Sequence, residues 1–263
     1  MYRFLLTPRW LGILALTLAA AAVMVSLGNW QLHRYQERAA INDRIDGAAR
    51  LPAAPLGEAL PGPGAAAGTA GPAPHADAAW TRVTVTGRYD IENVILVRGR
   101  TVANRVGFEV VTPLILADGS AVLVDHGWVP PAPGGATAQP ELPAIPTDAV
   151  TVIGRVRLSE SRPDTIGRRD GRIETRRVAV PELARQLPYP TYGAYLLLDE
   201  QDPPADAAFA PIPVRHENDW QNFGYVIQWW IFAAMSLVGF GWAARREATQ
   251  DRAPAPADRA GSG

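Results

Sequence analysis

The sequence predicts a membrane protein in which two transmembrane helices bracket an extracytoplasmic, β-rich (α+β) domain, built as an antiparallel barrel or sandwich. Two apolar runs without a charged residue, Trp10–Leu32 and Trp220–Ala244, predict the helices, because about 20 mostly apolar residues span a bilayer. Between them lie short segments in which apolar and polar residues alternate with period two, as is typical of strands. These observations predict a helical hairpin that carries one large domain on one side of a membrane.

The composition limits the chemistry that this domain can perform. The 263-residue chain has a net charge of −1, so its charge does not point to nucleic acid. It has no cysteine, which excludes disulfides, thiolate zinc sites, thiol nucleophiles and covalent haem attachment through a Cys-x-x-Cys-His motif. Apart from four histidines, its basic residues are all arginine, and Ala, Pro and Gly are abundant, which is typical of a GC-rich bacterial genome.

The first apolar run is expected to be an uncleaved anchor. It continues through Val23–Leu27, beyond the small residues Ala19–Ala22 that could end a signal peptide. Arg245, Arg246 and Arg252 crowd the end of the second run, and positive residues favour the cytoplasmic side. We therefore expect a multi-pass protein of the plasma (inner) membrane, with both termini in the cytoplasm and the main domain outside it.

Composition also divides the chain into segments. Residues 57–79 are largely Ala, Pro and Gly, and they cannot bury enough apolar surface to offset their ordering entropy, so disorder is expected there. The expected segments are a cytoplasmic tail (1–9), a transmembrane helix (10–32), a helix extension (33–56), the Ala/Pro/Gly-rich disordered insertion (57–79), the extracytoplasmic β-rich domain (80–219), a second transmembrane helix (220–244) and a disordered cytoplasmic tail (245–263).

Within the β-rich domain, turn signals separate the expected strands. Asp118-Gly119 between two apolar runs is typical of a β-hairpin turn. We expect a loop rich in Pro and Gly over Pro130–Pro146, a charged hairpin or loop over Arg168–Arg177, and a short helix over Pro181–Leu187 with proline in its first turn. The expected strands are Val83–Tyr89, Val94–Arg98, Phe108–Leu116, Ala121–Asp125, Val150–Leu158 and Tyr195–Asp199.

The sequence offers weak grounds for an enzyme. Asp125-His126 stands at a strand end, but a catalytic pair needs a nucleophile, and Ser120 is only a hairpin residue. The histidines lack the i, i+4 spacing of a helical metal site. We therefore expect no catalytic residues and no metal site, and an extracytoplasmic hydrolase stays a remote alternative.

Polar and aromatic residues in the second apolar run need an explanation. Gln221, Tyr225 and Gln228 share one helix face, and polar groups at this depth need partners. Trp229 lies about 14 Å along the helix from Trp220, too deep for an interfacial aromatic belt. Two explanations are open: a ligand site, or packing against small residues of the first helix, namely Ala15, Ala19, Ala22 and Ser26.

Several short motifs occur in an informative order. They are Trp30-Gln31-x-x-Arg34, Val85-Thr86-Gly87-x-Tyr89, Gly107-Phe108, Thr112-Pro113-Leu114, Gly127-Trp128-Val129-Pro130 and Tyr225-x-x-Gln228-Trp229. Through this ordered set and its two-helix topology, from about residue 10 to 245, the chain resembles the surfeit locus protein 1 family of cytochrome c oxidase assembly factors, in a bacterial, high-GC, actinobacterial-like form.

The resemblance implies a membrane assembly factor, not an enzyme. Such a factor assists haem a insertion, or the maturation of the subunit that carries haem, in a haem-copper terminal oxidase. The implied partners are the haem-bearing subunit of cytochrome c oxidase and the lipid bilayer, with haem a synthase as a further candidate and no nucleic acid. Haem a itself would be bound transiently.

Two positions depart from the family pattern. Many members have histidine three residues before the tyrosine of the second helix, where this chain has Asn222, and arginine where it has His126. An amide does not ligate iron as imidazole does, so the asparagine favours the alternative of a membrane-anchored interaction protein without haem contact. If haem a is bound, the candidate contacts are the aromatic residues Trp30, Tyr225 and Trp229, Arg34 for a propionate, and His33 or His216 for iron.

Overall fold

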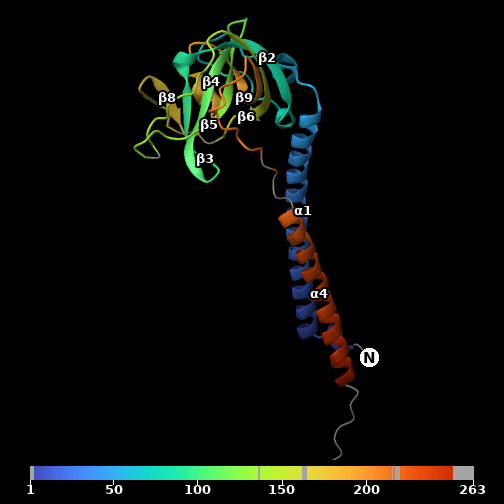
Figure 1. The fold of residues 1–263 in the computed structure, drawn as a ribbon. Helices are drawn as coiled ribbons and strands as arrows, with labels where there is room; N and C mark the ends of the chain where they lie inside the picture. The colour runs from blue at the N-terminus through green and yellow to red at the C-terminus, as the bar shows by residue number, and fades with distance from the viewer. Residues whose placement is uncertain (1–2, 136, 162–164, 215, 217–219, 251–263) are drawn as a thin grey trace, which may run out of the picture. The chain divides into compact units, whose positions relative to one another are not determined.

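The computed structural model describes residues 3–135, 137–161, 165–214, 216 and 220–250 (Figure 1). The chain forms two compact units. The first contains Met1–Asn42 and His216–Gly263, and the second is Asp43–Arg215. Long helices at the two ends of the chain therefore flank a β-rich domain in sequence, as expected.

Two long helices dominate the first unit. A 3₁₀ turn, η1 (Arg3–Leu6), precedes α1 (Pro8–Arg50), and α4 (Trp220–Gln250) lies near the other end of the chain. Both helices are long and apolar enough to cross a membrane. Helix α1 continues without a break into the polar part of the expected extension, because that part contains no proline and is rich in good helix formers.

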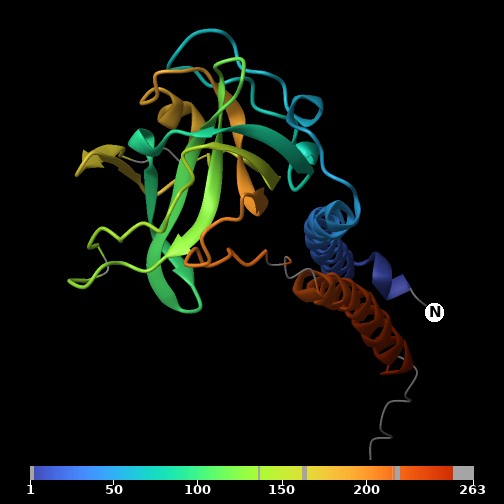
Figure 2. The ribbon, with the colours of Figure 1, turned by 45° about the horizontal axis from the view of Figure 1, so that its top comes forward.

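Within this unit α1 and α4 pack against each other in antiparallel directions (Figures 1 and 2). The ring centroids of Trp10 and Phe240 lie 5.8 Å apart, and those of Tyr35 and Phe223 lie 5.4 Å apart. Buried and half-buried residues recur at alternating spacings of three and four, as along the seam of a coiled coil. The seam contains Trp10, Leu14, Thr17, Ala21, Met24 and Gly28 on α1, and Val226, Trp229, Ala233, Ser236 and Phe240 on α4.

The small residues that pack in this seam differ from those suggested by the sequence. Ala21 and Gly28 are the buried small residues of α1. The four residues proposed as the packing face, Ala15, Ala19, Ala22 and Ser26, are exposed in this unit. Both sets repeat at helical spacing, so the choice between them depends on how the large side chains of α4 fit.

The second unit is built on a sheet that the described residues form from nine strands. All six expected strands are present, and the charged segment 168–177 forms a hairpin. The strands are β1 (Ala54–Pro55), β2 (Arg82–Tyr89), β3 (Ile95–Val102), β4 (Arg105–Ile115), β5 (Ala121–Val129), β6 (Ala149–Leu158), β7 (Gly167–Arg169), β8 (Arg172–Thr175) and β9 (Thr191–Asp202), with short helices α2 (Leu56–Ala59), η2 (Ala76–Ala78), η3 (Ile91–Asn93) and α3 (Val180–Ala184).

The sheet closes on itself, so the domain is a barrel. The strand order is β1-β2-β6-β9-β5-β4-β3-β8-β7, and β2 also pairs with β4, which closes the ring β2-β6-β9-β5-β4. At that corner a Cβ on Gly87 would come 2.5 Å from the carbonyl oxygen of Ile115, so glycine permits the close approach of the two strands. Most pairings are antiparallel as expected, but β1–β2, β3–β8 and β5–β9 are parallel, so the sheet is mixed.

Buried aliphatic side chains form the core of the domain. One cluster joins Leu114, Val124 and Leu196 of the barrel strands with Leu56 and Leu60. A second cluster packs α3 on the sheet through Val180 and Leu183, both fully buried, together with Ile95, Leu123 and Ile173. The apolar residues of α3 therefore explain why the short helix expected near Pro181 forms here.

The expected insertion, residues 57–79, makes specific contacts in the structure. The amide of Gly71 donates to the carbonyl of Thr191 at 2.7 Å, and the amide of Thr191 donates to the carbonyl of Thr69 at 2.9 Å. A Cβ on Gly193 would collide with the carbonyl oxygen of Pro72. These contacts are made by the backbone, so a composition without large apolar side chains does not reveal them.

Candidate functional site

The candidate residues of α1 cluster within one turn near the end of its apolar run. Trp30, His33 and Arg34 are all exposed. The guanidinium carbon of Arg34 lies 5.8 Å from the ring centroid of Trp30, and its Nη1 lies 3.6 Å from Oε2 of Glu37. This arrangement leaves an indole face, an imidazole and a cation on the surface of the helix.

On α4 the two aromatic candidates differ in burial. Tyr225 is 41% exposed, whereas Trp229 is half-buried. The Cβ of Trp229 lies 3.5 Å from the point where Gly28 would carry a Cβ, and its ring meets Phe232 edge-on at 6.2 Å. Trp229 therefore takes part in helix packing, whereas 41% of Tyr225 is left exposed for other contacts.

The antiparallel pairing brings these residues to one level along the helix pair. Tyr35 meets Phe223, and Gly28 meets Trp229, so these two contacts bracket both the α1 cluster and Tyr225. His216 is exposed in the segment before α4 and belongs to the same unit. The six sequence-predicted residues thus share one unit, with direct contact shown between Trp30 and Arg34.

Asn222 occupies the turn before Tyr225 and is half-buried. Among the described residues its Nδ2 is buried without a hydrogen-bond partner. An unsatisfied buried donor destabilises a protein by about 1–3 kcal/mol. The position of the family histidine is therefore taken by an amide that needs a partner from outside the described chain.

His126 lies in the barrel and is almost fully buried. Its ring stacks on Phe209 with centroids 5.1 Å apart, and the Tyr89 ring lies 4.6 Å away on a tilted plane. Burial lowers the pKa of His126 from 6.5 to about 4, so the imidazole is neutral at pH 7. Because aromatic rings pack against it, His126 is a core residue and is not accessible to a bound macrocycle.

The adjacent Asp125 does not form a catalytic pair with His126. Its Oδ1 accepts a hydrogen bond from the amide of Gly127 at 3.0 Å instead. Gly127 has a φ of +130° at the β4–β5 bulge, and a Cβ there would come 2.6 Å from the carbonyl oxygen of Ala210. The structure therefore gives the Asp-His pair a role in strand geometry, and it adds nothing to the hydrolase alternative.

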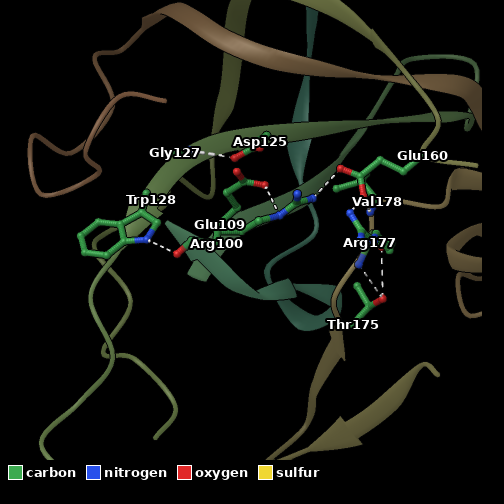
Figure 3. A network of polar contacts seen from close by, with 9 residues as sticks. All are labelled: Arg100, Glu109, Asp125, Gly127, Trp128, Glu160, Thr175, Arg177 and Val178. Carbon is green, nitrogen blue, oxygen red and sulfur yellow. Dashed lines mark hydrogen bonds and ion pairs between the residues drawn. The ribbon is translucent and has the colours of Figure 1, made fainter. Parts of the chain in front are cut away.

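A largely half-buried polar network that the sequence reasoning missed lies beside Asp125 (Figure 3). Arg100 of β3 places Nε 2.9 Å from Oε2 of Glu109 and Nη2 2.6 Å from Oε1 of Glu160. Glu160 also accepts the amide of Val178 at 3.3 Å and lies 3.8 Å from Nη1 of Arg177. One arginine thus joins β3 and β4 to the segment after β6, and through Glu160 to the segment after β8.

Burial sets the charge state of this network. Asp125 is 1% exposed, and burial, reinforced by the nearby Glu109 charge, raises its pKa well above 3.8. Burial also raises the pKa of Glu109, although the Arg100 guanidinium opposes this shift. The signal available in the sequence was Asp125, an ionisable residue that follows an apolar run directly. In the structure all nine residues of its strand, β5, are buried. Its partners come from separate strands and loops, so no spacing rule connects them.

The Gly-Trp-Val-Pro motif has a structural explanation at the same place. The indole Nε1 of Trp128 donates to the carbonyl of Arg100 at 3.0 Å (Figure 3). A Cβ on Gly107 would come 2.6 Å from the Trp128 ring, so Gly107 makes room for it. The motif therefore helps fix β3, β4 and β5 around the network.

Comparison with known proteins agrees with these motifs. The model of the SURF1 family matches residues 18–234. Uncharacterized SURF1-like proteins of Mycobacterium bovis and Mycobacterium tuberculosis are each 30% identical over 249 residues, which covers 93% of this chain and 86% of the relative. A SURF1-like protein of Monosiga brevicollis is 33% identical over 132 residues, 46% of each chain.

Proposed function

Because the chain belongs to the SURF1 family, which is linked to cytochrome oxidase assembly, we propose that it is a membrane assembly factor for cytochrome c oxidase. It assists haem a insertion or the maturation of the haem-bearing subunit. Haem a is its cargo and not a resident cofactor, so the protein binds, orients and releases the macrocycle and performs no chemical step on it.

The observation that carries this proposal is the surface of the helix pair. Trp30 and Tyr225 are 55% and 41% exposed at one level of the pair, and Arg34 stands beside Trp30. A haem has flat apolar faces that pack on aromatic rings and propionates that match a guanidinium. Trp229, half-buried, forms the inner edge of this surface.

If the iron is ligated, His33 or His216 supplies the imidazole. Both are exposed and belong to the same unit as the aromatic surface. Asn222 cannot replace the family histidine, and His126 is enclosed in the barrel. The geometry therefore favours a ligand on α1 or in the segment before α4, in place of one within α4.

The helices set the location that we propose. Both tails lie in the cytoplasm, and the barrel domain lies outside the plasma membrane, because Arg245 and Arg246 follow the apolar run of α4 within its last turns. The haem-bearing oxidase subunit and the bilayer are the proposed partners, and haem a synthase is a further candidate.

A second candidate function rests on Asn222. Its buried Nδ2, which has no hydrogen-bond partner among the described residues, would be satisfied by a polar group on a helix of the oxidase. In that case the chain is an interaction protein that holds the oxidase subunit and makes no haem contact.

A visible absorption spectrum separates the two candidates. The full chain is purified in detergent from cells that make haem a but lack the oxidase. We expect bound haem a in the wild type, and a shifted or absent spectrum in His33→Ala, in His216→Ala or in the double variant. His75→Ala is the matched control, because His75 is exposed and pairs with Asp77 outside the helix unit. A wild-type protein without haem, which still restores oxidase activity in a deletion strain, would establish the second candidate instead.

A further inference from the structure

The hairpin of β7 and β8 and the loop before β6 form one fixed structure. Asp170 and Gly171, with φ values of +50° and +81°, make the tight turn of the hairpin. Gln139 Nε2 donates to the carbonyl of Arg169 at 2.9 Å and to Oε1 of Glu174 at 3.0 Å. Arg169 in turn donates to the carbonyl of Thr137 at 2.9 Å. These bonds hold the loop against the hairpin.

A pocket of about 270 Å³ lies between the loop, the hairpin and β3. Its lining residues are Arg98, Thr137, Thr165, Gly167, Arg169 and Glu174. Arg169 and Glu174 form an ion pair at 2.6 Å, so their charges compensate each other. Among the described lining residues, Arg98 is therefore the charged group that no opposite charge compensates.

The guanidinium of Arg98 has no partner among the residues that the structure describes, although its side chain is half-buried. A neighbouring arginine also lacks a carboxylate there: Arg172, the cross-strand partner of Arg169, donates to the carbonyl of Pro140 at 3.2 Å. A half-buried arginine whose guanidinium has no acceptor is unfavourable, and the second positive charge strengthens the attraction for an anion.

We infer that this pocket receives a carboxylate side chain from an acidic segment of a partner protein. The fork of the Arg98 guanidinium matches a carboxylate in two parallel hydrogen bonds, and the hydroxyls of Thr137 and Thr165 are further donors. A single, partly exposed ion pair contributes only about 1 kcal/mol or less. A free carboxylate would therefore be held too weakly, whereas a partner's other contacts supply a high effective concentration.

This inference does not depend on haem binding, and a binding assay with a synthetic probe tests it. The full chain in neutral detergent is titrated into a fluorescently labelled peptide of glutamates, with a peptide of glutamines of equal length as the comparison, and anisotropy is measured. We expect the glutamate peptide to bind more tightly, and Arg98→Gln to weaken it about fivefold, as loss of one ion pair allows. Arg88→Gln on β2, an exposed arginine outside the pocket, is the matched control.

Arg98→Gln keeps the same unfolding midpoint in the expected case, because Arg98 makes no hydrogen bond or ion pair with the described residues that the variant would lose. Equal weakening by both substitutions would show general attraction to a basic surface and would overturn the pocket. The same holds if the wild type binds both peptides alike. Competition with acetate and inorganic phosphate distinguishes a carboxylate ligand from a phosphate ligand. If phosphate displaced the labelled glutamate peptide at a much lower concentration than acetate, the pocket would be assigned to phosphate groups, such as those of lipid headgroups. That result would also overturn the inference.

Discussion

The indole of Trp230 lies directly on Gly28 in the seam between α1 and α4. A Cβ at position 28 would come 2.5 Å from Nε1 and 2.6 Å from Cδ1 of Trp230. Small residues let membrane helices approach closely, because van der Waals contact replaces the hydrophobic effect as the source of their association. Gly28 therefore sets the spacing of the helix pair.

Gly28→Leu is expected to force the helices apart and to lower stability by about 1–3 kcal/mol, as overpacking does. The measurement is the unfolding midpoint of the detergent-solubilised protein, followed by tryptophan fluorescence. Gly12→Leu is the control on the same helix, because a Cβ at Gly12 would meet no described atom within 4 Å. Equal midpoints for the two variants would contradict the close seam.

Trp229→Leu should keep α4 inserted but lower oxidase maturation. Leucine favours membrane insertion, whereas it lacks the flat ring that would pack on a haem or a partner subunit. The readout is the level of membrane-extracted protein beside oxidase activity and haem a content in the same strain. Trp242→Leu is the control, since Trp242 is 62% exposed on the same helix. Normal activity at a normal protein level would leave Trp229 as packing alone.

His126→Phe is expected to make stability less dependent on acid pH. The folded state lowers the pKa of His126 from 6.5 to about 4, so the unfolded chain binds a proton that the folded chain does not. Stability is then lost as the pH falls from 6.5 towards 4, by about 2 kcal/mol at pH 5. Phenylalanine keeps the stacking on Phe209 without this proton. Unfolding midpoints at pH 7.5 and 5.0 should differ less in the variant; an unchanged difference would contradict the buried neutral imidazole.

Asp125→Asn should stabilise the protein more at pH 8 than at pH 5. Burial raises the pKa of Asp125, so the folded state keeps a proton that the unfolded chain releases, and stability falls as the pH rises above 3.8 towards the raised value. Asparagine is uncharged and retains Oδ1 for the Gly127 amide. Asp125→Ala, which loses that acceptor, should be destabilised at both pH values. An asparagine variant with no gain at pH 8 would show that Asp125 is ionised in the fold.

Membrane topology is tested with reporter fusions. A reporter after Gly263 and one inserted at Gly64 should report opposite sides of the membrane, with the first in the cytoplasm. Gly64 is exposed, and a Cβ there would meet no described atom within 4 Å, so the insertion should not disturb the barrel. Reports from the same side would contradict the helical hairpin.

The sequence was sufficient for the elements that carry a strong local signal. The uncharged runs predicted α1 and α4, and period-two alternation predicted β2 over Arg82–Tyr89 and β6 over Ala149–Leu158. Closure of the barrel was not predictable in detail. It depends on the pairing of Tyr89 with Leu114, and residues that meet across a closed sheet have no local pattern in the chain.

Local patterns also failed where two alternatives shared one period. Ala15 and Ala19 repeat at helical spacing as well as Ala21 and Gly28 do, but only the fit of Trp230 over Gly28 decides between them. Similarly, nothing in the sequence around Arg100 reveals Glu109 and Glu160 as its partners. Of the candidate site, the sequence identified exposed groups such as Trp30 on the helix pair, and it missed the polar network of the barrel.

The position of β9 in the barrel has a consequence for the order of events during synthesis. This strand, Thr191–Asp202, is the last that the structure describes, yet it lies between β5 and β6, both made earlier. A ribosome must therefore finish nearly the whole domain before the ring can close, while α1 has emerged long before. Only residues 203–219 then separate β9 from α4. The strand that completes the barrel and the second membrane helix are thus synthesised within a few seconds of each other at ordinary rates of translation.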